Sequence, residues 1–191
     1  KERDFDANKA MYPSYFGGGW TKVYLEKMCE FYARVGETRF TVARHSNVYG
    51  PHDKYDLDKS HVFGATMTKV MTAHDKLVVW GAGEERRDLL HVDDLVSFVE
   101  LALTKQSTKF ELFNVGLGQA IAIKDLVRAM VEASGRPLAI EHDLSKQSLN
   151  TALCLDCSRA AELLGWSPKI SLPEGIRRTM AWYRQNIHSP A

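Results

Sequence analysis

Short extended segments alternate with amphipathic helical segments along most of this chain. In the first helical segment, Tyr24, Met28, Phe31, Tyr32 and Val35 recur at helical spacing and form one apolar face. Further helices are predicted at 61–73, 93–103, 123–133, 159–164 and 173–185, and strands at 39–43, 77–80, 89–90, 110–115 and 138–141. Strands that alternate with helices of about ten residues predict an α/β fold.

Two segments near the N-terminus are predicted to be irregular. Residues 1–19 are polar and turn-rich and contain three consecutive glycines, so we expect the first helix to begin near Trp20 or Thr21. The run Asn47-Val-Tyr-Gly-Pro51 is predicted to be a turn-rich exit from the strand before it.

Length and charge limit the class of protein. The chain has 191 residues, which fits one domain or one domain with a subdomain, and 45% of them are apolar. Its 25 basic and 24 acidic residues give a net charge of +1. Proteins that bind nucleic acids or acidic membranes concentrate positive charge, so we expect neither partner. No apolar run approaches the ~20 residues of a membrane span, and we recognise no signal peptide.

The three cysteines are Cys29, Cys154 and Cys157. An odd number in a chain of this size favours reduced thiols and a cytoplasmic protein. Cys154 and Cys157 form a lone C-x-x-C pair, whereas a zinc site would need a second pair or histidines at ligand spacing. We therefore expect packing cysteines and no metal, with metal binding or redox use as the alternative.

Lys22 is the first candidate functional residue. It lies at the predicted start of a helix, after Gly17-Gly18-Gly19 and close to the aromatic Tyr15 and Trp20. A lysine in this position can hold a ribose and lower the pKa of a neighbour, and glycines let a ligand approach the backbone. The alternative is a solvated lysine with no ligand.

His61 is the second candidate. The run Asn47–Asp53 leaves the end of a strand, where α/β folds bind ligands, and Ser60-His61-Val62 opens a helix. The dipole at a helix N-terminus favours the neutral form of histidine, which suits acid–base chemistry near neutral pH. The alternative is a surface histidine beside a helix cap.

Trp80 and Arg87 are the third candidates. They stand seven residues apart around the glycine turn Gly81-Ala-Gly83. Tryptophan supplies a flat face for a base, and arginine makes a two-pronged contact with phosphate. Together they could grip the two ends of a nucleotide diphosphate. The alternative is a core tryptophan and a solvated cluster of charges.

The order of these motifs resembles the extended short-chain dehydrogenase/reductase family, the NAD-dependent epimerases and dehydratases of nucleotide sugars. The resemblance runs from about Tyr15 to the C-terminus. Within the family the chain is most similar to enzymes that epimerise and then reduce a GDP-bound 4-keto-6-deoxy sugar. The motifs that carry the resemblance are Asn47-Val-Tyr-Gly-Pro-His-Asp53, Ser60-His-Val62, Val79-Trp-Gly81, Leu90-His-Val-Asp-Asp94 and Leu164-Gly-Trp166.

The resemblance implies a role for each candidate. Lys22 matches the lysine of a Tyr-x-x-x-Lys motif and would hold the nicotinamide ribose of NAD(P). Asn47 would line the junction of nicotinamide and sugar, and His61 would be the acid–base residue for epimerisation. The residues that would contact the GDP portion are Lys69, Trp80, Arg87 and Lys146.

The chain also departs from the family pattern. Gly18 stands where the family has its catalytic tyrosine, and glycine cannot relay the proton that reduction of a ketone needs. Tyr15 could replace that tyrosine if the glycine loop bulges. After Lys146 a basic stretch of the family is replaced by residues 147–152, so base or phosphate recognition is expected to differ.

The resemblance implies the C-terminal part of a Rossmann-like parallel sheet plus a smaller α/β substrate-binding lobe. Residues 1–50 would be the remnant of a dinucleotide-binding domain and 51–191 the lobe, with 109–117 returning to the sheet. No glycine-rich dinucleotide loop precedes Lys22. We therefore expect a longer enzyme whose N-terminal half holds most of the NAD(P) site. The family also implies a homodimer through the helix at 21–35.

Three hypotheses follow from these observations. The first is an enzyme, a GDP-sugar epimerase or epimerase/reductase represented by its C-terminal part. The second is a non-catalytic module that keeps a nucleotide-sugar site, which the glycine at position 18 favours. The third is an interaction role in which exposed sheet edges pair with another chain.

Overall fold

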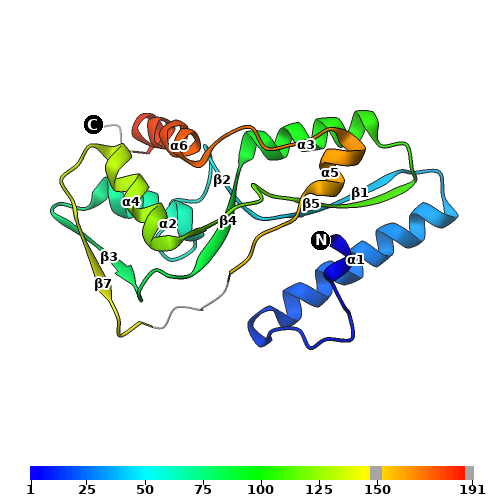
Figure 1. Ribbon diagram of the computed structural model, residues 1–191, viewed down its shortest axis with the longest axis horizontal. Coiled ribbons are helices and arrows are strands. Elements are labelled where there is room, and N and C mark those ends of the chain that lie inside the picture. Colours follow the sequence, from blue (N-terminus) through cyan, green and yellow to red (C-terminus); the bar gives the residue numbers. More distant parts are fainter. Residues whose placement is uncertain (147–151, 188–191) are drawn as a thin grey trace.

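The α/β class predicted from the sequence is confirmed by the structure, a computed structural model that describes residues 1–146 and 152–187 (Figure 1). Two 3₁₀ turns, η1 (Glu2–Asp4) and η2 (Pro13–Tyr15), come first. The helices are α1 (Phe16–Val35), α2 (Val62–Thr72), α3 (Val92–Lys105), α4 (Ile123–Ser134), α5 (Ser158–Leu164) and α6 (Leu172–Asn186). The strands are β1 (Phe40–His45), β2 (Asn47–Tyr49), β3 (Lys76–Trp80), β4 (Arg86–His91), β5 (Phe110–Val115), β6 (Ala120–Ala122) and β7 (Ala139–Asp143).

The strands pair mostly in parallel. Strand β1 pairs with β5 from Phe40 opposite Phe110 to His45 opposite Val115. Strand β2 pairs with β4, and β3 pairs with β7, both in parallel, whereas β6 runs antiparallel to β4. Parallel strands need a crossover connection, which the helices between them provide. The domain boundaries proposed above, including the return of 109–117 to a Rossmann sheet, remain a prediction.

Two predicted boundaries were wrong at the N-terminal side. Helix α1 begins at Phe16, so the three glycines are helical and do not form a loop. The segment expected to be a turn after β1 contains the short strand β2 at Asn47–Tyr49, because its backbone pairs with β4. Strand β5 has the predicted bounds, whereas α4 ends at Ser134, one residue beyond the predicted end, and Gly135 caps it with a left-handed φ of 68°.

Two hydrophobic clusters form the core. One joins α2, α4 and α6 to β3, through residues such as Met67, Val79, Leu126 and Ile176. The other joins α3 and α5 to β4 and β5, and Trp166 lies within it. In Figure 1, α3 and α5 lie on one side of β1 and β5, and α1 lies on the other. This division places α1 apart from the elements that pack around α2.

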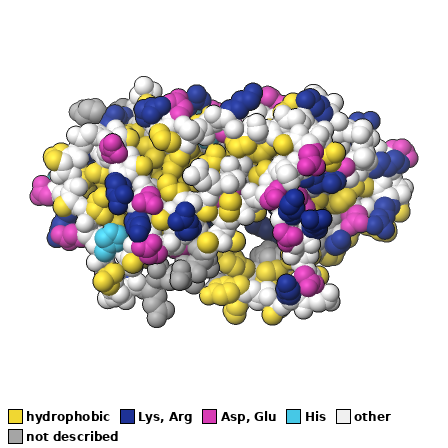
Figure 2. Space-filling view, in the orientation of Figure 1, with side chains coloured by type: hydrophobic (Ala, Val, Ile, Leu, Met, Phe, Trp, Pro, Cys, Tyr) yellow, Lys and Arg dark blue, Asp and Glu magenta, His cyan; other side chains and the backbone are white. Residues whose placement is uncertain are grey.

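Helix α1 carries an exposed apolar face. Ala33 is its buried residue, whereas Phe16, Tyr24, Leu25 and Val35 are each more than half exposed. Figure 2 shows hydrophobic side chains gathered along this edge of the molecule. Among the described residues, no helix combines the length and the apolar character that crossing a membrane requires.

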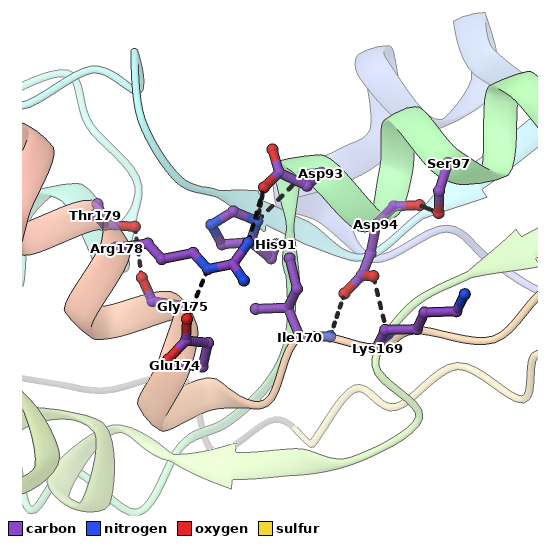
Figure 3. Close-up of polar contacts among 10 residues, drawn as sticks. All are labelled: His91, Asp93, Asp94, Ser97, Lys169, Ile170, Glu174, Gly175, Arg178 and Thr179. Carbon is purple, nitrogen blue, oxygen red and sulfur yellow. Dashed lines mark hydrogen bonds and ion pairs between the residues drawn. The ribbon is translucent and has the colours of Figure 1, made fainter.

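A polar junction fastens α6 to the start of α3 (Figure 3). His91 caps α3, since its Nδ1 accepts the Asp93 N–H at 3.2 Å. Arg178 bridges the carboxylates of Asp93 at 3.3 Å and Glu174 at 2.8 Å. The carboxylate of Asp94 accepts the backbone N–H groups of residues 169 and 170. The loop that leads into α6 is thereby fixed to α3.

His91 is expected to make the stability of the fold depend on pH. Its side chain is buried, and burial lowers its pKa below the ordinary value of 6.5. As the pH falls below about 6.5, the unfolded chain therefore takes up a proton that the folded chain refuses. The free energy of unfolding should fall by up to about 1.4 kcal/mol per pH unit until the folded-state pKa is reached.

Urea unfolding at several pH values between 5 and 7.5 measures this effect. His91→Asn is the matched variant, because asparagine also caps helices and carries no titrating group near neutral pH. In the variant, the free energy of unfolding should change less steeply with pH, because the contribution of His91 is absent. An equal pH dependence of the free energy of unfolding in the two proteins would contradict the contribution given to His91.

Substitution by alanine should change the free energy of unfolding in opposite directions at Gly64 and at Gly18. A Cβ at Gly64 would lie 2.3 Å from the backbone oxygen of Lys54, so Gly64→Ala should lower the free energy of unfolding by about 1–3 kcal/mol. A Cβ at Gly18 would have no neighbouring atom within 4 Å, and Gly18→Ala should raise the free energy of unfolding by about 0.5 kcal/mol through helix propensity. Thermal unfolding of both variants checks the signs, and a stabilising Gly64→Ala would refute the close packing described here.

Candidate nucleotide-sugar site

A cavity of about 740 Å³ lies between α2, β3 and the first turns of α4. This volume falls in the range of small-molecule sites. Its apolar wall comprises Leu57, Val62, Ala65, Leu77, Val78, Val79, Ile123 and Val127. Lys69, Trp80 and Glu85 add a cation, a large aromatic ring and an anion to the lining. The cavity therefore offers an apolar floor with a few polar groups at fixed places.

Two lysine side chains approach the ring of Trp80, which lines this cavity. The Lys69 ammonium is 5.4 Å from the centre of the Trp80 ring, and the Lys146 ammonium is 5.9 Å from it. Lys69 also donates a hydrogen bond to the backbone oxygen of Val78 at 3.2 Å. The Trp80 side chain is 64% exposed, so it is not a core residue. The structure thus brings together three residues, far apart in sequence, that were predicted to contact a nucleotide.

Arg87 lies on β4 and is mostly buried, with its guanidinium paired to the carboxylate of Glu85. Glu85 itself lines the cavity, which places this ion pair at the cavity edge. Sequence reasoning missed Glu85, because the run of charges at 84–87 does not reveal which acid faces which base. The short spacing between Glu85 and Arg87 was the available indication.

His61 is the N-cap residue of α2, one position after the Ser60 that the sequence suggested as the opening residue. Its side chain is exposed and does not bond to the end of the helix. Ser60 and Val62, the residues on either side of it, line the cavity, whereas His61 itself does not belong to the lining.

Lys22, Gly18 and Tyr15 all lie at the start of α1. Gly18 and Lys22 are separated by four helical residues, so they share one face about 6 Å apart along the axis. Tyr15 is the N-cap residue of α1 and lies about 10 Å from Lys22 along the axis, with its ring 6.0 Å from that of Tyr12. The bulged glycine loop that would bring Tyr15 to Lys22 is not formed.

Asn47 lies on β2, where its side-chain amide donates to the backbone oxygen of Asp88 at 3.3 Å. Neither Asn47 nor Lys22 belongs to the lining of the cavity. Helix α1 lies on the far side of β1 from α3 (Figure 1). In the described part of the chain, Lys22 on α1 and Asn47 on β2 therefore both lie outside the cavity lining. It contains no group of three or more metal-ligating side chains.

The model of the NAD dependent epimerase/dehydratase family matches residues 17–116, which is 100 of the 191 residues. The chain belongs to this family. The family resemblance inferred from the sequence motifs is thereby confirmed, and the matched segment includes α1, the cavity residues on α2 and β3, and β4.

Individual relatives agree with this assignment. The chain is 35% identical over 146 residues to GDP-L-fucose synthase 1 of Arabidopsis thaliana, covering 74% of this chain and 45% of that protein. It is 31% identical over 172 residues to GDP-L-fucose synthase of Escherichia coli (strain K12), covering 84% and 53%. The chain spans about half the length of the curated relatives it matches.

A solved structure gives the same picture of the fold. UDP-glucose 4-epimerase from Thermotoga maritima, determined with UDP-glucose, superimposes with a TM-score of 0.79 at 30% sequence identity. The match covers 88% of this chain and 53% of that one. The α/β arrangement described above is therefore shared with this solved structure.

Proposed function

We propose that this chain carries the nucleotide-sugar site of an epimerase that acts on a GDP-bound 4-keto-6-deoxy sugar. The observation that supports the proposal best is that the Lys69 and Lys146 ammonium groups both approach the ring of Trp80, which lines a cavity together with Lys69 and with Ser60 and Val62, the two neighbours of His61. The names of the GDP-L-fucose synthases that the chain matches support GDP as the nucleotide.

The nucleotide would bind through its base and its phosphates. The exposed Trp80 ring offers a stacking face, and the ammonium groups of Lys69 and Lys146 are point charges that attract phosphate. Arg87 would add a two-pronged contact once a phosphate competes with Glu85 for its guanidinium. The cavity is large enough to enclose part of such a ligand.

The reaction assigned to His61 is proton transfer at carbon. A proton on the carbon next to a ketone is acidic, because its removal gives an enolate. The neutral imidazole of His61 would take this proton on one face of the sugar, and a second group, outside this chain, would return a proton to the other face. Inversion at that carbon follows.

The NAD(P) that the family name implies has a fitting contact on α1. The Lys22 ammonium is exposed and makes no hydrogen bond within the described residues, and Gly17 and Gly18 leave the backbone beside it open. Lys22 would hold the ribose, and Asn47 would lie where nicotinamide and sugar meet. When bound, the cofactor supplies hydride transfer at the sugar carbonyl. Most of its site is proposed to lie in an N-terminal half.

The second candidate is a module that binds nucleotide sugars without turning them over. Gly18 favours it, because no hydroxyl stands one helical turn before Lys22 to protonate a carbonyl oxygen during reduction. Tyr15, the N-cap residue of α1, precedes Lys22 by about two turns, so the proposal does not give it that role. We therefore propose epimerisation by His61 as the activity and do not assign reduction to this chain.

Incorporation of solvent deuterium tests the proposal. The full-length protein is incubated in D₂O with GDP-4-keto-6-deoxymannose, and the mass of the sugar is followed. Incorporation without consumption of NADPH is the expected result. A sugar that binds and gains no deuterium would favour the binding module, and a sugar that does not bind would contradict both candidates.

The proposal also includes the oligomeric state of the protein and its location in the cell. A homodimer through α1 is supported by the exposed apolar face of that helix, and sedimentation of wild type and Leu25→Glu would test it. A cytoplasmic location, expected from the cysteines, also belongs to the proposal.

A further inference from the structure

The turn that leads into β4 holds Glu85 in the wall of the cavity. The backbone oxygen of Glu85 accepts the N–H of Ile123 at 2.9 Å, and that of Gly83 accepts the N–H of Lys124 at 3.0 Å. Gly83, Glu85 and Ile123 all belong to the lining of the cavity. Arg87 follows within β4, which pairs with β6. Glu85 and Arg87 therefore lie on backbone that is fixed to α4 and to β6.

The side chains of Glu85 and Arg87 form an ion pair that is largely withdrawn from water. The Glu85 side chain is 19% exposed and the Arg87 side chain 13% exposed. The same guanidinium also donates to the backbone oxygen of Arg86 at 3.1 Å. A pair in this position is screened less by water and salt than a pair on the surface. Glu85 lines the cavity and Arg87 does not, so the acidic member of the pair belongs to the cavity wall.

The charges around the cavity make this arrangement matter for an anionic ligand. Among the described residues, the ionisable side chains of the lining are Asp58, Lys69 and Glu85. Lys146 contributes a second ammonium group beside the tryptophan of the wall. A phosphate that enters the cavity therefore meets carboxylates as well as cations, and the charge of Arg87 is already neutralised by Glu85. The phosphate can use Arg87 only by drawing it away from Glu85.

We propose that Glu85 sets the affinity and the charge selectivity of the nucleotide site by competing with phosphate for Arg87. Carboxylate and phosphate oxygens both match the fork of a guanidinium, so one can replace the other. Separation of the pair costs free energy that a phosphorylated ligand recovers through its own contact with Arg87. An uncharged nucleoside has no such contact and leaves the pair intact. The inference rests on the proposed function, because it needs a phosphate in this cavity.

Calorimetric titration of GDP and of guanosine into the 191-residue chain tests the competition. Glu85→Gln keeps the length of the side chain and an acceptor oxygen for Arg87, and it removes the charge. The variant should bind GDP at least about threefold more tightly than wild type, on the scale of one ion pair. Its affinity for guanosine should not rise. An equal affinity for GDP in the two proteins, or an equal gain for guanosine, would overturn the proposal.

Glu84→Gln is the matched control. Glu84 is the preceding glutamate, its side chain is 60% exposed, and it pairs with Lys124 at 2.5 Å. It does not belong to the lining of the cavity. In about 0.15 M salt, where exposed charges are screened, this variant should bind GDP within about twofold of wild type. A gain as large as that of Glu85→Gln would mean that any nearby carboxylate acts alike, and would reject the specific role of Glu85.

The Arg87→Ala background separates competition from simple repulsion. When Glu85→Gln is added to Arg87→Ala, the gain in GDP affinity should be smaller than in wild type, because no guanidinium is there to be released. An equal gain in both backgrounds would contradict competition for Arg87. Glu85→Ala also removes the charge and is measured in place of Glu85→Gln if the latter does not fold.

The outcomes distinguish this inference from the proposed function. GDP that binds wild type and Glu85→Gln equally well rejects the role of Glu85 and leaves the proposed function standing. GDP that binds neither protein contradicts both. Tighter binding of GDP to Glu85→Gln, together with no entry of deuterium into the sugar in the full-length protein, supports the competition and rejects epimerisation alone.

Discussion

His61→Gln is expected to lower the rate of C–H exchange next to the sugar carbonyl by at least about 100-fold. General acid–base catalysis by one positioned side chain contributes about 10²–10⁴ in rate. Glutamine has a similar length and hydrogen-bonding groups and cannot take up the proton. Since His61 is exposed and does not cap α2, the free energy of unfolding should change by less than about 0.5 kcal/mol.

The matched control is His74→Gln. His74 is an exposed histidine just past the other end of α2. Exchange followed by mass spectrometry in D₂O should proceed at the wild-type rate in this variant. Affinity for the nucleotide should stay within about twofold of wild type in both variants, because neither residue belongs to the proposed GDP contacts. Wild-type exchange in His61→Gln would remove His61 from the mechanism.

Asp88→Ala is expected to lower the free energy of unfolding by about 3–5 kcal/mol. The Asp88 carboxylate is buried and accepts three backbone N–H groups, from Leu117 at 2.8 Å, Gly118 at 3.2 Å and Leu155 at 3.1 Å. These donors belong to two segments that Asp88 ties to β4. Alanine would leave all three donors without their acceptor, and hydrogen bonds to a charged group are among the strongest in proteins.

Urea unfolding compares Asp88→Ala with two variants. Asp88→Asn keeps the size and one acceptor oxygen, so its loss should be smaller. Asp125→Ala removes an exposed carboxylate that is 3.5 Å from Arg128, and its effect should stay below about 0.5 kcal/mol. A loss under about 1 kcal/mol in Asp88→Ala would mean that other acceptors replace the carboxylate.

The elements with strong local patterns could be predicted from the sequence. Strand β5 has the predicted bounds, and α4 begins at the predicted residue and ends one residue beyond the predicted end. The start of α1 could not be predicted, because glycine disfavours helices locally. In the folded chain Gly19 packs against Met11 so closely that a Cβ would lie 2.8 Å from it, a tertiary contact with no local signature. Strand β6 has only three residues, and its pairing with β4 decides its conformation.

In the candidate site, too, the sequence indicated which residues take part, but it did not indicate which partners they contact. The family resemblance pointed to Lys69, Trp80 and Lys146, and in the structure the two ammonium groups approach the Trp80 ring. The pairing of Arg87 with Glu85 depends on how loops lie against β4, which spacing does not specify. The roles assigned to the site residues stay predictions.

Calorimetric titration of GDP into the 191-residue chain tests the nucleotide site most directly. The account predicts binding that Lys69→Ala weakens about tenfold or more, since a hydrogen bond to a charged group contributes about 1.5–3 kcal/mol. Lys76→Ala should bind like wild type, because Lys76 is exposed and pairs with Glu141 at 3.1 Å. No binding to the wild-type chain, or equal affinity in all three proteins, would contradict the site described here.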